Sequence, residues 1–199
     1  MSATTSGKAS EGRRPAQALL RRWPTAFALA LTVPGLVLGT SDDPADSVHG
    51  YADFLPILPL LYVVIHQAGK PKVTWPVLVV GAAFAFALQA LDLVSPAGVM
   101  VGVALAVLLW GAFRGTPHGP AVFGIQAAGA VLFGALAGTG LLVDPDLGRY
   151  VVAAGWFCHG VWDLAHIRMR GLQGIVAPTF AEWCAVVDMM VAVELLFLT

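Results

Sequence analysis

Residues 73–94 read VTWPVLVVGAAFAFALQALDLV and contain a single charged side chain, Asp92. As an α-helix, a run of about 20 apolar residues is long enough to cross the hydrocarbon core of a bilayer. Similar runs recur along the chain and are separated by short segments that contain Gly, Pro, Asp, Lys or Arg. We therefore predict an all-α fold, a polytopic transmembrane helical bundle.

The composition of the whole chain agrees with this class of protein. Of the 199 residues, 58% are hydrophobic and 12% are charged, and the mean hydropathy is +0.79. This leaves too little polar surface to cover a soluble globule, so we expect membrane lipids as the main surroundings. The net charge of -1 and the scattered basic residues exclude a groove that follows nucleic-acid phosphates. Cys158 and Cys184 lie in apolar runs, where we expect buried thiols and no disulfide framework.

We predict one transmembrane domain, residues 23–199, after a flexible basic cytosolic tail, residues 1–22. Seven spans are expected, at residues 24–40, 54–69, 73–94, 98–113, 121–143, 150–167 and 180–198. The first run follows Arg21 and Arg22 and also has the length of a cleaved signal, in which case six spans remain. The sequence does not predict an oligomeric state.

The basic residues predict the orientation, because loops on the cytoplasmic side of membrane proteins collect Lys and Arg. With seven spans, ten of the 11 basic residues fall on the side of the N-terminus, and only Arg149 falls on the other. The ten are Lys8, Arg13, Arg14, Arg21, Arg22, Lys70, Lys72, Arg114, Arg168 and Arg170. The predicted loops opposite are acidic and contain Asp42, Asp43, Asp46, Asp53, Asp144 and Asp146. We therefore place the N-terminus in the cytoplasm. The high content of Ala, Gly, Val and Leu, with Arg outnumbering Lys, favours a bacterial plasma (inner) membrane.

The sixth predicted span contains the densest group of polar residues, in the stretch GWFCHGVWDLAH, residues 155–166. Ionisable side chains in hydrocarbon cost about 2.5–3.5 kcal/mol each, so they need partners or a function. His159, Asp163 and His166 stand at i, i+4 and i+7 and fall within about 60° of one another on a helix. The spacing predicts one polar stripe.

Residues of the neighbouring spans are expected to meet this stripe. The sixth and seventh spans are antiparallel, which places Asp163 and Asp188 at about the same depth, 10–12 Å from the cytoplasmic boundary. Cys184 shares a helical face with Asp188. Residues His66 and Glu182 are expected, with His166, nearer the cytoplasm, so that the site opens inward. Trp156 and Trp162 are expected to line the same pocket.

Two imidazoles and one or two carboxylates can bind Zn²⁺ and leave a position for a water whose pKa the metal lowers. We predict His159, Asp163 and His166 as ligands of Zn²⁺ or another divalent metal, with Asp188 as general base or fourth ligand. Such a site would hydrolyse a lipid-soluble small molecule. A metal-free enzyme is a second interpretation, in which a protonated Asp163 or Asp188 starts the cyclisation of an isoprenoid and Trp156 and Trp162 stabilise cations.

In its ligand types the stripe resembles a superfamily of seven-helix membrane hydrolases, which includes alkaline ceramidases and adiponectin-receptor-like proteins. In that superfamily, His and Asp residues near one membrane face hold zinc. This chain lacks the family's paired histidines four residues apart on one late helix, because Asp163 stands where the second would be. The resemblance implies a zinc-dependent hydrolase and covers about a dozen residues.

Two further interpretations need no metal. Gln89, Asp92 and Glu194 form a second predicted polar group toward the outer side. With the inner cluster they would complete a relay across the membrane, as in a proton- or ion-coupled transporter or sensor. The polar residues could also serve helix packing alone, through hydrogen bonds between spans. His49 and His118 lie in predicted loops and are expected to be solvated.

Overall fold

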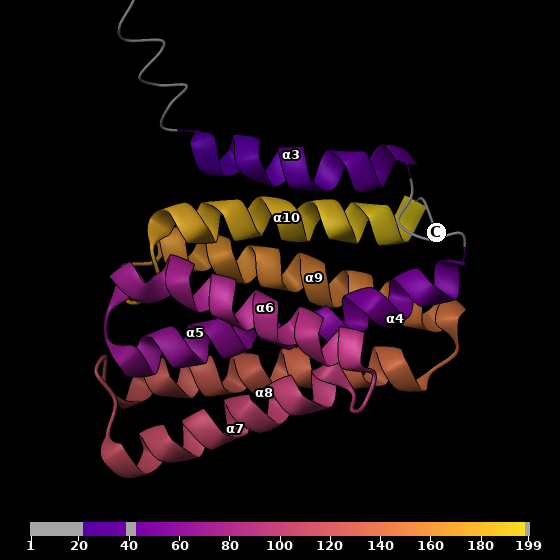
Figure 1. The fold of residues 1–199 in the computed structure, drawn as a ribbon. Coiled ribbons are helices and arrows are strands. Elements are labelled where there is room, and N and C mark those ends of the chain that lie inside the picture. The colour runs from indigo at the N-terminus through magenta and orange to yellow at the C-terminus, as the bar shows by residue number, and fades with distance from the viewer. Residues whose placement is uncertain (1–21, 39–42, 198–199) are drawn as a thin grey trace, which may run out of the picture.

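The computed structural model describes residues 22–38 and 43–197, and every regular element in these ranges is helical (Figure 1). The elements are α3 (Trp23–Leu38), α4 (Pro44–Phe54), α5 (Ile57–Ala68), the short 3-10 turn η1 (Pro71–Val73), α6 (Thr74–Leu91), α7 (Pro96–Arg114), α8 (Pro120–Leu142), α9 (Pro145–Arg168) and α10 (Pro178–Phe197). The predicted all-helical fold is confirmed for the described residues. The predicted tail falls almost wholly outside them.

Short connections make successive helical segments run in alternate directions through the bundle (Figure 1). Residues 92–95 join α6 to α7, and residues 143–144 join α8 to α9. The closest pair is α9 and α10, which lie antiparallel, and α3 packs on the other side of α10 (Figure 1). The helix α5 lies in the interior, where it contacts α6, α7 and α8.

The second span begins earlier than the sequence predicted. We expected an acidic loop before residue 54, whereas residues 44–54 form α4. The start of this helix is well specified, because Asp43 accepts a hydrogen bond from the backbone N–H of Ala45 and Pro44 occupies the first turn. A break at Leu55 and Pro56 separates α4 from α5. Together they form the apolar segment Ala45–Ala68, which is 24 residues long.

Four helical segments of the described chain are long and apolar enough to cross a membrane: Ala45–Ala68, Pro71–Leu91, Pro96–Arg114 and Pro120–Leu142. Helices α9 and α10 have 24 and 20 residues, but the polar residues discussed below make them less apolar. Large apolar side chains of α6 are exposed, including Val79, Val80 and Phe86. Exposed apolar surface of this extent is typical of a protein surrounded by lipid. A helical membrane bundle is therefore supported, and seven spans stay a prediction.

The two ends of the bundle differ in charge. At one end α3, α6, α8 and α10 begin, and we call it the basic end because its described charged residues include Arg22, Lys70, Lys72, Arg114, Arg168 and Arg170. At the other end α4, α7 and α9 begin, and we call it the acidic end because it contains Asp43, Asp46, Asp53, Asp92, Asp144 and Asp146. That the basic end faces the cytoplasm stays a prediction.

Several acids of the acidic end stabilise helix starts. Asp144 accepts a hydrogen bond from the backbone N–H of Leu147 in the first turn of α9. Asp53 accepts one from the backbone N–H of Ala97 in the first turn of α7. A carboxylate at a helix N-terminus satisfies free N–H groups and interacts favourably with the helix dipole. These acids therefore have structural roles.

Candidate metal centre

Close packing of α9 against α10 brings their polar residues together. Gly160 of α9 lies directly against α10, and a Cβ atom built on it would lie 3.3 Å from the Asp188 Cβ and 3.3 Å from the Ala185 carbonyl oxygen. Small residues at a helix contact allow membrane helices to approach closely. Because the helices are antiparallel, a pair of residues at i and i+4 on each then meets the pair on the other.

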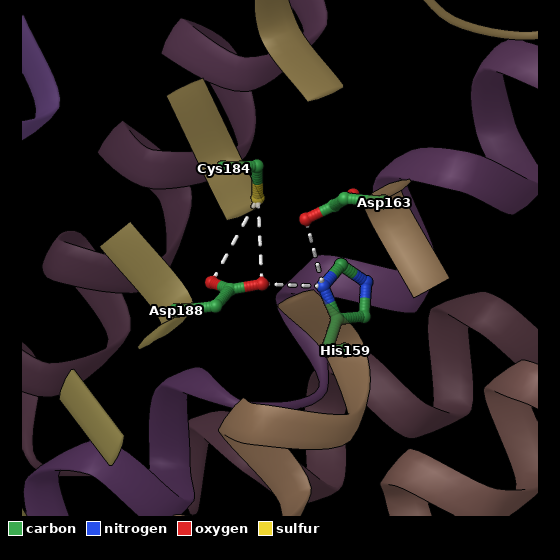
Figure 2. A group of neighbouring side chains, drawn as sticks. All are labelled: His159, Asp163, Cys184 and Asp188. Carbon is green, nitrogen blue, oxygen red and sulfur yellow. Dashed lines mark hydrogen bonds and ion pairs between the residues drawn. The ribbon is translucent and has the colours of Figure 1, made fainter. Parts of the chain in front are cut away.

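The residues that meet are His159 and Asp163 of α9 and Cys184 and Asp188 of α10 (Figure 2). Each offers one possible ligand atom, and these atoms lie within 4.8 Å of one another. The His159 Nδ1 atom is 2.7 Å from Asp188 Oδ2 and 3.5 Å from Asp163 Oδ2. The Cys184 sulfur is 3.9 Å from both carboxylate oxygens of Asp188. Solvent reaches none of the four to more than 1%.

Aromatic rings surround the imidazole of His159. The ring of Phe133 on α8 packs against it edge to face, with ring centroids 4.9 Å apart. The ring of Tyr62 on α5 packs in the same way at 5.7 Å. The second ring nitrogen of His159, Nε2, is buried and has no hydrogen-bond partner in the described structure. The polar side of this imidazole is therefore Nδ1, which faces Asp163 of α9 and Asp188 of α10.

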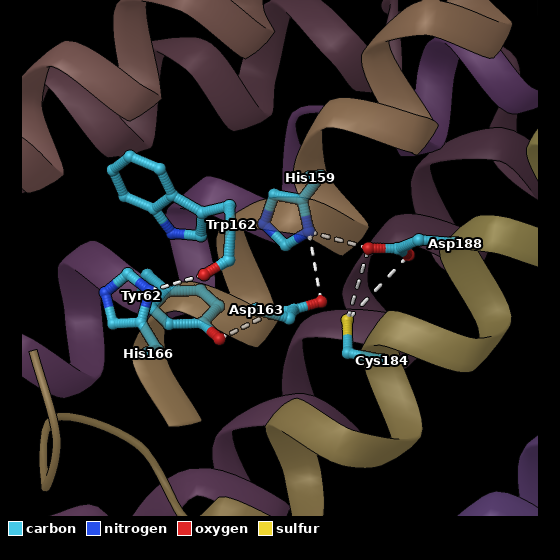
Figure 3. A network of polar contacts seen from close by, with 7 residues as sticks. All are labelled: Tyr62, His159, Trp162, Asp163, His166, Cys184 and Asp188. Carbon is cyan, nitrogen blue, oxygen red and sulfur yellow. Dashed lines mark hydrogen bonds and ion pairs between the residues drawn. The ribbon is translucent and has the colours of Figure 1, made fainter. Parts of the chain in front are cut away.

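Tyr62 belongs to the site and was not predicted. Its hydroxyl donates a hydrogen bond of 2.5 Å to Asp163 Oδ1, so that Asp163 lies between Tyr62 and His159 (Figure 3). On a span rich in Leu, Ile and Val, a tyrosine looks like one more packing residue. The available signal was chemical: a buried phenol needs a hydrogen-bond partner, and Tyr62 is 1% exposed.

His166 lies next to this group but outside it. Its Nδ1–H donates to the carbonyl oxygen of Trp162, at 2.9 Å, and its Nε2 is 3.0 Å from the amide nitrogen of Gln126. In this arrangement the Gln126 amide donates to Nε2, and both ring nitrogens are occupied. The ring of Tyr62 packs against the His166 ring at a tilt of 55°, with ring centroids 4.6 Å apart (Figure 3). The fourth member of the cluster is therefore Cys184, whereas the sequence predicted His166 in this place.

The residues predicted at the inner mouth are dispersed. Glu182 accepts hydrogen bonds from Thr25, at 2.6 Å, and from Arg22, at 3.3 Å, and so links α10 to α3. His66 is buried, and its Nδ1 lies 3.1 Å from the Nδ1 of His118. The interpretation of His118 as a solvated loop residue is therefore wrong in part, because the turn between α7 and α8 packs this half-buried ring onto α5. His49 is exposed as expected.

The two tryptophans and the predicted outer group also separate. Trp156 donates its indole N–H to the carbonyl oxygen of Tyr51, whereas Trp162 packs against Phe133 and His166. Glu194 is buried and accepts a hydrogen bond of 2.8 Å from the Tyr51 hydroxyl. Gln89 and Asp92 are exposed at the end of α6, and Asp92 ends that helix in the left-handed region, with φ 49°.

Searches against protein-family models, curated proteins and solved structures each found no match. The class of protein therefore follows from the structure alone. The chain is a bundle with several apolar helices, and it contains a buried cluster of His, Asp and Cys side chains that could hold a metal ion. Imidazole, carboxylate and thiolate are together the donor types that Zn²⁺ accepts.

Proposed function

We propose that this protein is a membrane metalloprotein that binds a divalent transition-metal ion, Zn²⁺ by its donor types, inside the bundle. The ligands are His159, Asp163, Asp188 and Cys184. The observation that carries the proposal is the convergence of four donor atoms from two antiparallel helices within 4.8 Å, with the side chains buried.

Charge supports a cation at this place. Asp163 and Asp188 lie in a buried interior, and a buried carboxylate is costly unless an opposite charge or hydrogen bonds compensate it. A protonated His159 would compensate one of the two carboxylate charges, and a neutral His159 would compensate neither. A divalent cation would balance both carboxylates. The centre would then be neutral if Cys184 stays an unbound thiol, and it would have a net charge of −1 if Cys184 binds the metal as a thiolate.

Distances support the same proposal. In a tetrahedral Zn²⁺ site the metal–ligand distances of about 2.0–2.3 Å place the ligand atoms about 3.3–3.8 Å from one another. The separations of 3.5 Å between His159 and Asp163 and 3.9 Å between Cys184 and Asp188 are close to this range. The 2.7 Å contact between His159 and Asp188 would lengthen by a small side-chain rotation.

The role of Cys184 decides what the metal does. With Cys184 as the fourth ligand the shell is closed, as in structural zinc sites. With only His159, Asp163 and Asp188 bound, a fourth position stays open, and a bound metal there would activate water for hydrolysis of a lipid-soluble substrate. Asp188 contacts His159 Nδ1 directly and is better placed as a ligand than as the general base.

The isoprenoid cyclase gains no support, because Trp156 donates its indole N–H to the Tyr51 carbonyl oxygen and so contacts α4.

The first experiment measures the metal content of purified protein by mass spectrometry, without chelators, for wild type and His159→Gln. We expect about one Zn²⁺ per chain in wild type and at least a tenfold loss in the variant, because one of three or four ligands is removed. His49→Gln is the matched control, since His49 is exposed on α4 and bonds only within its own helix. Size-exclusion chromatography and circular dichroism check the fold of each variant. Metal-free wild type after incubation with Zn²⁺, or equal metal in His159→Gln, would refute the proposal.

The second experiment loads the protein with Co²⁺ and records its absorption spectrum for wild type and Cys184→Ser. A thiolate-to-cobalt charge-transfer band that disappears in the variant identifies the closed site. Bound Co²⁺ without this band identifies Cys184 as a bystander and leaves the open, hydrolytic site. The substitution exchanges sulfur for oxygen only, so we expect the helix packing to be retained.

A proton relay is the second candidate, and one observation favours it. Polar groups connect in sequence from the Tyr62 hydroxyl through Asp163 and His159 to Asp188 (Figure 3). Such a chain of exchangeable protons could pass a proton between α5 and α10. It predicts proton flux in liposomes, which the metal site does not.

A further inference from the structure

A second feature lies at the acidic end, on other helices than the metal centre. A cavity of about 630 Å³ lies between α4 and the end of α6, and its lining residues are Asp46, Ser47, Gly50, Tyr51, Phe54, Phe86 and Gln89. The volume is within the range of small-molecule sites. The metal centre and the polar chain from Tyr62 to Asp188 do not use this cavity, whose lining includes Gln89 of the predicted outer polar group.

Aromatic rings form much of its wall. Phe54 of α4 and Phe86 of α6 lie against each other across the two helices, with ring centroids 4.9 Å apart. Tyr51 lines the cavity one helical turn before Phe54 and packs edge to face on Trp156 at 5.8 Å. Phe86 is 60% exposed, so its ring is accessible to a ligand. The faces of such rings are electron-rich and attract cations.

Carboxyl groups lie on two sides of these rings. Asp46 lines the cavity, and in the described structure its carboxylate takes part in no hydrogen bond or ion pair. By contrast, Asp53 and Asp144 accept hydrogen bonds from the backbone N–H groups of Ala97 and Leu147. Glu194 is buried behind Tyr51 and accepts the hydrogen bond of its hydroxyl. The exposed carboxylate of Asp46 gives the mouth of the cavity a negative potential, and the carboxyl group of Glu194 lies behind the aromatic wall.

We propose that this cavity binds a small organic cation, with an alkylammonium head group against Asp46 and the rings of Tyr51, Phe54 and Phe86. Aromatic rings with a nearby carboxylate are the combination that recognises quaternary ammonium groups. A bare metal cation fits less well, because the wall is mainly carbon and offers few oxygen ligands. An anion is disfavoured by Asp46, and Gln89 is a donor and acceptor for a polar substituent at the rim.

The test compares choline with 3,3-dimethyl-1-butanol, which has the same shape and no charge. Binding to the full chain in lipid nanodiscs is measured by NMR saturation transfer and titration. We expect choline to bind at least about tenfold more tightly than the neutral isostere, since only the cation interacts with the rings and with Asp46. Equal affinities, or no choline binding at about 10 mM, the weak end of ligand recognition, would overturn the proposal.

Two variants locate the binding. Asp46→Asn keeps the size of the side chain and should weaken choline binding about fivefold to tenfold, without affecting the isostere. Phe86→Leu keeps the wall apolar and should weaken choline binding about threefold to tenfold. The matched control is Asp146→Asn, an exposed acid at the same end, in the first turn of α9, that does not line the cavity. A loss in the control as large as in Asp46→Asn would show attraction by the acidic end as a whole and refute this site. Metal content should be unchanged in all three variants, so this test is independent of the metal centre.

Discussion

At the scale of single residues, Tyr62 tests how the metal centre is supported. In Tyr62→Phe the hydroxyl that donates to Asp163 Oδ1 is lost, while the ring and its packing stay. Partners of metal-ligating groups typically contribute 10- to 100-fold to metal affinity, so we expect a loss of this size for Zn²⁺. We also expect the free energy of unfolding to fall by about 1–3 kcal/mol, because a buried carboxylate oxygen loses its partner. Competition with a chromophoric chelator measures the affinity.

The matched control for this prediction is Tyr150→Phe. Tyr150 is exposed near the acidic end, and its hydroxyl accepts a hydrogen bond from Arg149 of the same helix. Its loss should change neither Zn²⁺ affinity nor stability measurably. If Tyr62→Phe keeps the Zn²⁺ affinity of wild type and loses only stability, then the Tyr62 hydrogen bond serves helix packing and does not support a metal ligand.

The sequence predicted the residues of this site unevenly. The spacing of His159 and Asp163, with Asp188 at the same depth on an antiparallel neighbour, was sufficient to expect their contact, because helical geometry fixes it. Tyr62 comes from α5, which is distant along the chain, and Gln126 comes from α8, which directly precedes α9. Periodicity carries no information about which face of either helix meets α9. His166 was placed on the correct face, but its rotamer and its bond to Gln126 depend on the packing of α8.

At the scale of elements, the approach of α9 to α10 depends on Gly160. In Gly160→Val the added Cβ would lie 2.9 Å from the Met189 Cε and 3.3 Å from the Ala185 carbonyl oxygen and the Asp188 Cβ. The methionine tip can move, whereas the backbone oxygen cannot, so the helices must separate. We expect an overpacking cost of about 1–3 kcal/mol in the free energy of unfolding and loss of bound metal. Thermal unfolding in detergent and metal analysis measure the two effects.

Gly102→Val is the matched control for Gly160→Val. Gly102 lies within α7, and a Cβ added to it meets no atom within 4 Å. The same substitution there should leave metal content and unfolding temperature almost unchanged. A Gly160→Val protein that keeps its metal would show that the four ligands do not depend on the close packing of these two helices.

Helix boundaries were predicted well where charge or Gly and Pro end an apolar run, and poorly where they do not. The expected span 121–143 agrees with α8, which begins at Pro120 after the turn at Gly119. The start of the second span was wrong by about ten residues, because α4 is acidic and amphipathic and reads as a loop by hydropathy. The sequence signal for this helix is its start, where Asp43 is the N-cap residue and Pro44 lies in the first turn.

At the scale of the whole molecule, topology can be tested with single cysteines in a Cys158→Ala background, in which the remaining Cys184 is buried. We expect His49→Cys, at the acidic end, to react with a membrane-impermeant maleimide in intact cells. Lys72→Cys, at the basic end, should react only after permeabilisation, because basic ends face the cytoplasm. Seven spans also place a C-terminal epitope tag outside. Labelling of Lys72→Cys in intact cells would reverse the orientation, and a tag accessible only after permeabilisation would indicate an even number of spans.

The relay and the metal centre differ in how much of the molecule they need. A relay must cross the membrane, so Glu194 would be as essential as Asp163, whereas a metal site is complete within one part of α9 and α10. Glu194 follows Asp188 by six residues, about 9 Å along α10, and its described partner is Tyr51. In Glu194→Gln the amide oxygen can still accept that hydrogen bond, so the fold should be retained.

We therefore expect Glu194→Gln to keep the metal content of wild type, while Asp163→Asn loses at least about tenfold. In liposomes with an imposed pH gradient and a pH-sensitive dye inside, we expect no proton flux for wild type above that of empty liposomes. Flux that both substitutions abolish would establish the relay. In that case the two buried carboxylates of the centre exchange protons, and no resident cation is needed to balance them.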